Sequence, residues 1–218
     1  MGTLVLIRHG QSQWNLENRF TGWTDVELSE QGKKDAVACG KAIKDFHFDC
    51  AFTSDLKRAQ DTLTIILKTM NHPEISITKD KALNERHYGD LQGLNKAEMA
   101  AKYGEEQVKL WRRSYSTQPP GGERLADCYA RVIPYFESQI LPLVQQGKKV
   151  IVTAHGNSMK PIFKYLNQLD DDTTAAMEVG LCLPYIFTFD GTTIINKEVR
   201  EVPGLVAKGT SDIHAQNK

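Results

Sequence analysis

The sequence predicts an α/β fold, a three-layer α/β/α sandwich whose mostly parallel sheet carries an antiparallel edge strand. Short apolar segments alternate with segments whose apolar residues recur at helical spacing, which is the order expected of parallel strands joined by helices. Near the end of the chain, two strand-like segments flank Asp190-Gly191, a pair typical of hairpin turns. These strands form the antiparallel edge.

The first half of the chain supplies three predicted strands and four predicted helices. Ser29, Ser54 and Asn95 each stand just before a helical pattern and are typical N-cap residues. Glu98 follows Asn95 by three positions, as in a capping box. The expected strands span 3–8, 49–54 and 74–77, and the expected helices span 29–46, 54–70, 95–104 and 105–115.

The second half begins with a long helix at 125–145, in which Pro134 predicts a kink. A fully apolar strand at 149–155 follows, then a helix that begins near residue 156 and the hairpin at 183–199. We expect residues 1–202 to form a single catalytic domain, because no linker divides them. Residues 203–218 are polar and aperiodic, which predicts a mobile tail.

Composition excludes several classes of function. Lys and Arg total 27, as do Asp and Glu, so no net charge attracts nucleic acid or an anionic membrane. No apolar run has the length of a membrane span, and no signal-peptide pattern opens the sequence. The four cysteines lack metal-ligand spacing, so we expect reduced thiols in a cytoplasmic protein.

Two predicted strands end in the same way. The first ends in Arg8-His9 and the strand at 149–155 ends in His155, and a glycine follows each histidine. In open α/β sheets ligands bind beyond the carboxyl ends of strands, so neighbouring strands would bring His9 and His155 face to face. A single histidine of this kind often only satisfies a turn, but the repetition favours a site.

The two glycines suggest what the site binds. Gly10 and Gly156 let the backbone turn sharply and expose N–H groups to an anion. Asn157 and Ser158 then open a helix whose N-terminus attracts negative charge, which favours phosphate. Each glycine taken alone could be an ordinary turn residue.

Arginines near this edge extend the site. Arg58 falls in the first turn of a predicted helix, where a cation opposes the helix dipole, so its position suggests a bidentate phosphate contact. A solvent-exposed Arg58 is the alternative. Arg112 and Arg113 form a pair on a helix, which by itself is typical of a solvated face.

The segment at 83–96, LNERHYGDLQGLNK, is turn-rich and unusually dense in polar groups. Glu85 is a candidate general acid or base, and Tyr88 and Lys96 could hold a substrate carboxylate or phosphate. Arg86 and His87 lie between them and join the candidate binding residues. A surface cluster of salt bridges explains the same composition equally well.

Five segments taken together resemble one known family. They are LIRHGQSQWN, FTGWTDVELSEQG, SDLKRAQDT, LNERHYGDLQG and VTAHGNS. Their order and spacing are similar to those of the 2,3-bisphosphoglycerate-dependent phosphoglycerate mutases, a branch of the histidine phosphatase superfamily. The resemblance covers residues 4–202.

The resemblance implies a reaction and a role for each site residue. His9 would be the nucleophile that becomes phosphohistidine, Glu85 the proton donor and acceptor, and His155 a stabiliser of the transferring phosphoryl group. We expect a backbone carbonyl at the strand end to bind the second nitrogen of His9, and a nearby cation to lower its pKa. The phosphoryl pocket would comprise Arg8, Gln11, Ser12, Asn15, Thr21, Gly22, Arg58, Gly156 and Asn157, while Tyr88, Lys96, Arg112 and Arg113 grip the rest of the ligand.

The resemblance further implies substrates, a cofactor and an assembly. The enzyme would interconvert 3-phosphoglycerate and 2-phosphoglycerate in glycolysis and gluconeogenesis, with 2,3-bisphosphoglycerate as the primer that phosphorylates His9. Phosphoryl transfer surrounded by arginines requires no metal. A homo-oligomer, dimer or tetramer, is expected.

Two departures from the family and two other functions remain open. Gln13 stands where the family usually has glutamate, and the segment at 114–122 is shorter than in many relatives. A histidine phosphatase would pass the phosphoryl group from His9 to water, hydrolysing small phosphate esters. A phosphoanion-docking protein would keep the fold without the chemistry, although intact His9, Glu85 and His155 argue against it.

Overall fold

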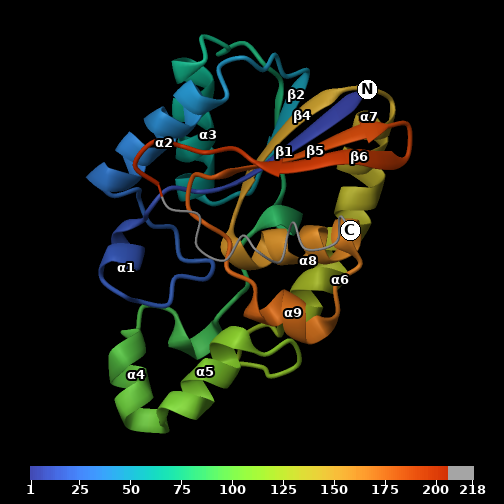
Figure 1. Cartoon of the computed structure of the whole chain (residues 1–218). Helices are drawn as coiled ribbons and strands as arrows, with labels where there is room; N and C mark the ends of the chain where they lie inside the picture. The colour runs from blue at the N-terminus through green and yellow to red at the C-terminus, as the bar shows by residue number, and fades with distance from the viewer. Residues whose placement is uncertain (206–218) are drawn as a thin grey trace.

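The chain folds around one twisted sheet of six strands in a computed structural model that describes residues 1–205 (Figure 1). The strand order is β3-β2-β4-β1-β5-β6. The strands are β1 (Gly2–Arg8), β2 (Cys50–Thr53), β3 (Ile77–Lys79), β4 (Lys149–Ala154), β5 (Pro184–Asp190) and β6 (Thr193–Val199). Of the tail predicted at 203–218, residues 206–218 lie outside the described part of the chain.

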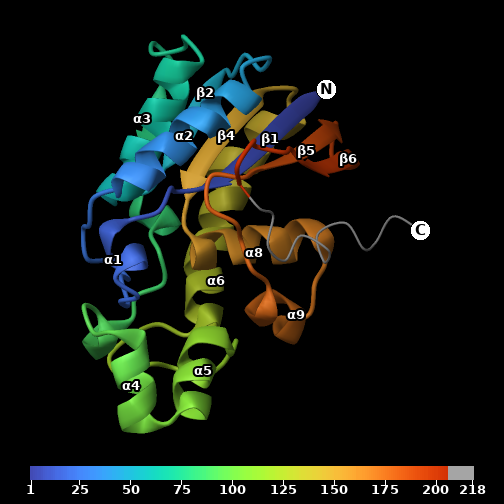
Figure 2. The ribbon, with the colours of Figure 1, turned by 60° about the vertical axis from the view of Figure 1, so that its left-hand side comes forward.

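Helices cover both faces of this sheet (Figure 2). They are α1 (Gln13–Leu16), α2 (Glu30–Ala42), α3 (Lys57–Thr69), α4 (Lys96–Tyr103), α5 (Glu105–Arg113), α6 (Leu125–Tyr135), α7 (Leu141–Gln145), α8 (Gly156–Asn167) and α9 (Asp171–Ala176). Short 3₁₀ turns lie at Lys81–Leu83 and Gly89–Leu91, and a π-helical turn lies at Phe136–Ile140. No helix among residues 1–205 is long and apolar enough to cross a membrane.

The predicted α/β class is confirmed. Strands β3, β2, β4 and β1 are parallel, and β5 pairs antiparallel with β1 and β6. Alternate residues of β1 enter two separate cores, because side chains of a strand point to opposite faces. Val5 and Ile7 pack with α2 and α3, whereas Leu4 and Leu6 pack with α6 and α8. Burial on both faces explains why these strands are apolar throughout.

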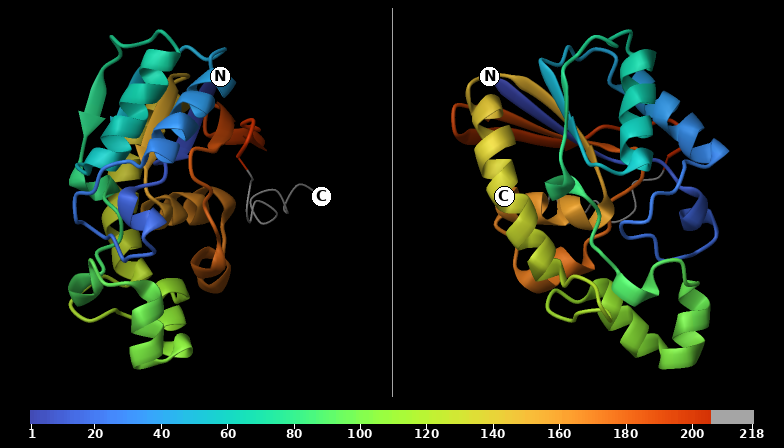
Figure 3. Two further views of the ribbon diagram at one scale, coloured as in Figure 1. Left: turned by 90° about the vertical axis from the view of Figure 1, so that its left-hand side faces the viewer. Right: turned by 180° about the vertical axis from the view of Figure 1, so that it is seen from behind.

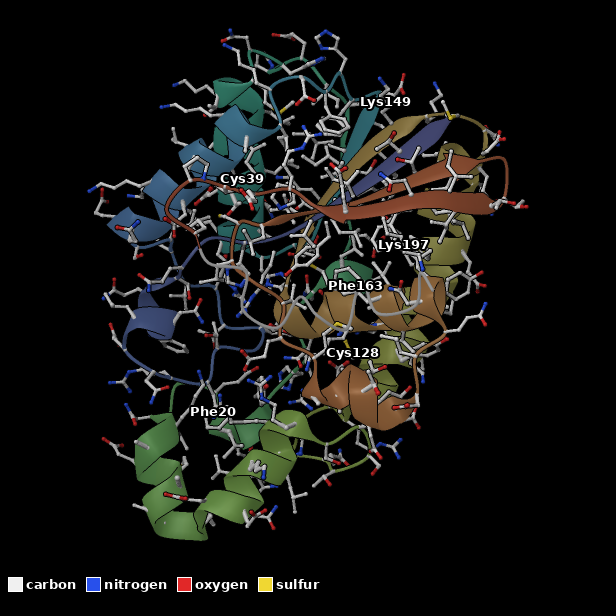
Figure 4. The ribbon with its side chains drawn as sticks, in the orientation of Figure 1. Phe20, Cys39, Cys128, Lys149, Phe163 and Lys197 are labelled. Carbon is white, nitrogen blue, oxygen red and sulfur yellow. The ribbon has the colours of Figure 1, made fainter. Side chains whose placement is uncertain are left out.

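A smaller lobe projects beyond the carboxyl end of the sheet (Figure 3). It consists of α4 and α5, which pack around a third cluster of Phe20, Leu91, Met99, Val108 and Trp111. Figure 4 shows Phe20 beside α4, while Lys149 lies at the opposite end of the sheet. The lobe therefore stands on the side of the sheet where β1 and β4 end.

Several predicted boundaries were wrong by a few residues. Helix α2 ends at Ala42, not at residue 46, and the third strand begins at Ile77, where pairing with β2 begins. Helix α3 begins at Lys57, because Ser54 accepts the N–H of Leu56 rather than capping the helix. The short helices α1 and α9 were not predicted.

Other sequence signals were confirmed. Asn95 caps α4, and its Oδ1 accepts the N–H groups of Ala97 and Glu98. The long helix after residue 125 is interrupted directly after Pro134 by the π-helical turn, and Pro142 then lacks the N–H that would bond the preceding turn. The four cysteines are free thiols.

Gly32, an irregularity in the α2 pattern, lets two backbones meet. A Cβ atom at Gly32 would lie 2.1 Å from the carbonyl oxygen of Gln11, and one at Gly10 would lie 2.5 Å from the carbonyl oxygen of Gly32. The loop after β1 is thus held directly against the first turn of α2. Gly10 serves this contact in addition to the turn that follows His9.

We expect Gly32→Ala to lower the free energy of unfolding by about 1–3 kcal/mol, the cost of overpacking, although alanine favours a helix by about 1 kcal/mol. Denaturant unfolding measures the change. Lys34→Ala, at an exposed position of the same helix, is the control. Equal stability of Gly32→Ala and the wild type would contradict the close contact.

Candidate active site

The two histidines predicted to face one another do so. Strands β1 and β4 are parallel neighbours, with Arg8 opposite Ala154 in the register. His9 and His155 therefore leave the sheet at the same edge, and their ring centroids are 5.0 Å apart. Both side chains are buried, at 2% and 0% exposure.

Hydrogen bonds fix the orientation of the His9 ring. Its Nδ1 lies 2.6 Å from the carbonyl oxygen of Gly10, which can only accept, so Nδ1 carries the proton. The lone pair is then on Nε2, which accepts from Nε of Arg58 at 3.3 Å. Burial, with Arg58 and Arg8 nearby, lowers the pKa of His9 well below 6.5. The imidazole is therefore neutral at neutral pH, with its lone pair on Nε2.

Arg58 is buried, which excludes the solvent-exposed alternative. Its guanidinium donates to the carbonyl oxygens of Thr24 at 3.1 Å and Gly22 at 2.8 Å. Burial lowers the pKa of Arg58 to about 10, so it remains a cation at neutral pH. The loop at 22–24 and α3 thus hold one positive charge against Nε2 of His9.

Arg8 supplies a second cation. Its guanidinium donates to the carbonyl oxygen of Val179 at 2.8 Å and lies against Gly156, where a Cβ atom would come within 3.3 Å of Cζ. Nε of Arg8 is buried and has no hydrogen-bond partner within residues 1–205. A buried N–H group without a hydrogen-bond partner is suited to donate to a bound anion.

Glu85 joins the polar loop at 83–96 to the start of α8. Its Oε1 accepts the N–H groups of Arg86 at 2.8 Å and Asn157 at 3.0 Å. The side chain is only 7% exposed, and its charge acts on Arg8 and Arg58. A carboxylate held this way beside neutral His9 can take or return a proton of a bound hydroxyl.

His155 is buried behind the other groups. Its Nε2 lies 2.7 Å from Oγ of Ser54, and its Nδ1 has no partner among the described residues. Burial, together with Arg58, His9 and Arg8, lowers the pKa of His155 well below 6.5.

Arg8, His9, Arg58 and Glu85 line a cavity of about 430 Å³, whereas the predicted catalytic residue His155 lies outside its wall. Its wall includes most of the residues predicted for the site: Arg8, His9, Asn15, Thr21, Gly22, Arg58, Glu85, Tyr88, Lys96, Arg112, Arg113, Gly156 and Asn157. The arginine pair at 112–113 therefore lines the cavity, and the side chain of Arg113 is also partly exposed to solvent. Residues more than a hundred positions apart meet here because the α4–α5 lobe stands over the strand ends.

The positive charges of Lys96, Arg112 and Arg113 are only partly compensated by carboxylates. Burial, with Arg112 and Arg8 nearby, lowers the pKa of Lys96 to about 8. Burial and the adjacent Arg113 also lower the pKa of Arg112. Arg113 pairs with Glu178 at 2.6 Å, and both side chains are partly exposed. Burial and neighbouring cations thus disfavour the charged forms of Lys96 and Arg112, and negative charge in the cavity would favour those forms.

Four predicted binding residues are not in the cavity wall. Gln11 accepts from Ser29 at 2.9 Å, and Ser12 caps α1. Arg86 is fully buried and donates to Tyr88 and to backbone carbonyls of α5. The ring of His87 packs edge-on against Trp23 at 5.3 Å. These residues make contacts with neighbouring segments of the chain instead of lining the cavity.

The cavity wall also contains residues that the sequence did not indicate: Arg19, Phe20, Asp35, Lys160, the segment at 177–181 and Leu205. Lys160 lies one helical turn after Gly156 of the AHGNS motif, a spacing that could have suggested it. Gln13 is exposed and donates to Glu17 at 3.0 Å, away from His9. The described residues contain no group of three or more His, Cys, Asp or Glu side chains that could hold a metal ion.

Comparison with known proteins gives consistent results. The profile of the histidine phosphatase superfamily (branch 1) matches residues 4–201. A protein of Gloeobacter violaceus named 2,3-bisphosphoglycerate-dependent phosphoglycerate mutase 2 is 53% identical over 194 residues, which cover 88% of this chain and 89% of the relative. A protein of Methylocella silvestris named 2,3-bisphosphoglycerate-dependent phosphoglycerate mutase is 49% identical over 201 residues, 91% of this chain and 98% of the relative.

Solved structures share the fold. A mycobacterial glucosyl-3-phosphoglycerate phosphatase has a TM-score of 0.76 and 28% identity, covering 93% of this chain and 98% of its own. A phosphoglycerate mutase from Bacillus anthracis has a TM-score of 0.75 at 22% identity, covering 91% and 92% of the two chains. The second similarity concerns the fold alone.

The buried histidines make stability depend on pH. An unfolded histidine binds a proton near pH 6.5, whereas folded His9 and His155 do not, so the unfolded state binds more protons below that pH. We expect the free energy of unfolding to fall from pH 6.5 to 5 by up to about 1.4 kcal/mol per pH unit for each histidine.

Urea unfolding across this pH range measures the effect. The double variant His9→Gln/His155→Gln should lose this part of the slope, and His47→Gln, at an exposed position, should retain it. An unchanged slope in the double variant would show that the histidines are not buried in the neutral state.

Proposed function

The chain belongs to the histidine phosphatase superfamily, branch 1, and we propose that it is a 2,3-bisphosphoglycerate-dependent phosphoglycerate mutase. It interconverts 3-phosphoglycerate and 2-phosphoglycerate, a step of glycolysis and gluconeogenesis. The observation that carries this proposal is a single cavity with cations at both ends. Arg8 and Arg58 stand beside His9, while Lys96, Arg112 and Arg113 line the lobe side.

His9 is the nucleophile. Its Nε2 lone pair attacks phosphorus while Nδ1 remains bonded to the Gly10 carbonyl, so the ring keeps its orientation as it gains positive charge. Arg8, Arg58 and the N–H groups at the start of α8 stabilise the negative charge on the phosphoryl oxygens. His155 lies against His9 and adds a donor on the same side.

Glu85 moves the proton. When the phosphoryl group passes from phosphorylated His9 to the 2-hydroxyl of 3-phosphoglycerate, the carboxylate takes the hydroxyl proton and 2,3-bisphosphoglycerate forms. When the 3-phosphate of this ligand then passes to His9, the carboxylate returns the proton to the 3-oxygen, and the product is 2-phosphoglycerate. Two N–H bonds to its Oε1 hold the carboxylate toward the cavity. The main-chain N–H of Asn157 therefore donates to the Glu85 carboxylate, and Asn157 itself lies in the phosphate-binding turn at the start of α8.

Charges at both ends of the cavity fit 2,3-bisphosphoglycerate as the primer. The unpartnered Nε of Arg8 is suited to one phosphate. Burial and neighbouring cations lower the pKa values of Lys96 and Arg112, which both line the cavity, so a second anion bound there would be stabilised. When bound, that ligand supplies the phosphoryl group for His9. Cations at both ends let either of its phosphates face His9.

A histidine phosphatase is the alternative, favoured by the similarity to the glucosyl-3-phosphoglycerate phosphatase. It would need the same His9 pocket but an acceptor water. The cations of the lobe side favour the mutase, because they would hold a phosphoglycerate whose own hydroxyl accepts the phosphoryl group.

We further propose that the protein is a cytoplasmic homo-oligomer. Sedimentation would measure the number of subunits.

The mutase assay supplies 3-phosphoglycerate, a trace of 2,3-bisphosphoglycerate and EDTA, and follows 2-phosphoglycerate and free phosphate together. We expect isomerisation with little phosphate release. His9→Ala should lose about 10⁴-fold or more of kcat, because it removes the nucleophile. His47→Ala is the control, since His47 is exposed. Dominant phosphate release would support the phosphatase instead, and silence on both products would support a docking protein.

Glu85→Gln keeps the size of the side chain and removes its basicity. We expect kcat to fall about 10²- to 10⁴-fold, the usual contribution of general acid–base catalysis, with KM changed far less. Steady-state kinetics with 3-phosphoglycerate test this. Glu98→Gln, at an exposed position of α4, is the matched control, and a Glu85→Gln variant with wild-type kcat would exclude Glu85 as the proton carrier.

A further inference from the structure

A buried lysine stands in the cavity wall and has no part in the reaction described above. Lys160 lies on α8, one helical turn beyond Gly156, and is 3% exposed. Its Nζ donates to the carbonyl oxygen of Ala175 at 2.7 Å, the only hydrogen-bond partner it has within residues 1–205. Because an ammonium group carries three donors, two N–H groups remain for a ligand.

The surroundings of Lys160 contain more positive than negative charge. Arg113 on α5, Arg86 in the loop before α4 and Arg8 on β1 act on it as cations, and Glu85 is the opposing anion. Burial, reinforced by these arginines, lowers the pKa of Lys160 to about 7. A buried lysine is rare and costly unless it is paired, so this position has a use that an apolar residue could not supply.

We propose that Lys160 is a further ligand of the phosphoglycerate, with its two remaining N–H groups donated to the anionic end remote from His9. The proposal rests on the proposed function and extends it. The partner of Lys160, Ala175, lies three residues before Glu178, which pairs with Arg113 at 2.6 Å. Because Lys160, Glu178 and Arg113 all line the cavity, the amine lies with the distal cations. An anion bound there stabilises the ammonium form, so binding above neutral pH takes up a proton.

A purely structural role makes different predictions. Ala175 lies in the last turn of α9, where carbonyl groups lack partners within the helix, so Lys160 also caps that helix. If capping were its only role, Lys160→Met would lower the melting temperature without changing ligand affinity or proton uptake. Lys164 offers a matched control on the same helix, since it bonds the carbonyl of Leu169 at 2.7 Å and is not in the cavity wall.

The test is calorimetric titration of the full chain with 3-phosphoglycerate at pH 8, in two buffers of different ionisation enthalpy. We expect the wild type to take up protons on binding. Lys160→Met should bind about tenfold to hundredfold more weakly, the range for a charge-assisted hydrogen bond, and take up fewer protons. Lys96, whose pKa is lowered to about 8, accounts for the uptake that remains.

Lys160→Arg separates charge from titration. The guanidinium stays protonated, so this variant should recover part of the affinity while proton uptake stays low. Lys164→Met should match the wild type in both readouts. Wild-type affinity and uptake in Lys160→Met would overturn the proposal, and if that variant does not fold, wild-type uptake in Lys160→Arg would overturn it.

The failure of this proposal and of the proposed function can be told apart. If the wild type binds 3-phosphoglycerate without isomerising it, the mutase function is refuted, and the titrations still decide whether Lys160 binds the ligand. A wild type that does not bind 3-phosphoglycerate would refute both.

Discussion

The active site depends on one backbone pairing, the parallel ladder between β1 and β4. Six residue pairs in register bring Arg8 level with Ala154, so the two strands end together and the next residue of each is a histidine. A shift of one residue would turn every side chain of a strand to the other face. Val5 and Ile7 would then exchange cores with Leu4 and Leu6, so the packing that stabilises the sheet also fixes the distance between His9 and His155.

The second constraint is the positive charge of the site, which opposes the burial that packing of the sheet imposes. Packing removes water from the strand ends, and the same burial lowers the pKa values of Arg8, Arg58, Lys96 and Lys160. The cavity wall therefore holds cations that the protein itself only partly neutralises, through Glu85 and Glu178. This arrangement costs stability in the free protein and favours a ligand with negative charge at both ends.

The sequence predicted those features that residues close together in the chain determine. The buried strands, the two histidine–glycine pairs and the cation-rich loops have recognisable residue types at short range, and they converge in the structure. The burial of Lys160 was missed because an amine on an amphipathic helix looks like a surface residue until the packing of α9 is known. The contact made by Gly32 was also missed, since its partner Gln11 is distant in sequence.

Arg86 shows how the two ends of the site are coupled. Its guanidinium is fully buried and donates to the carbonyl oxygens of Trp111 and Arg112, and to the hydroxyl of Tyr88. Its own N–H is bonded to Glu85, so Glu85 and the end of α5 are joined through one residue. The polar segment at 83–96 suggested Arg86 as a binding residue, but Arg86 is not in the cavity wall. We propose that it acts as a positioning residue, which ties Arg112 on α5 to the Glu85 carboxylate. The α4–α5 lobe is thus anchored to the strand ends at the point where a phosphoglycerate would span them.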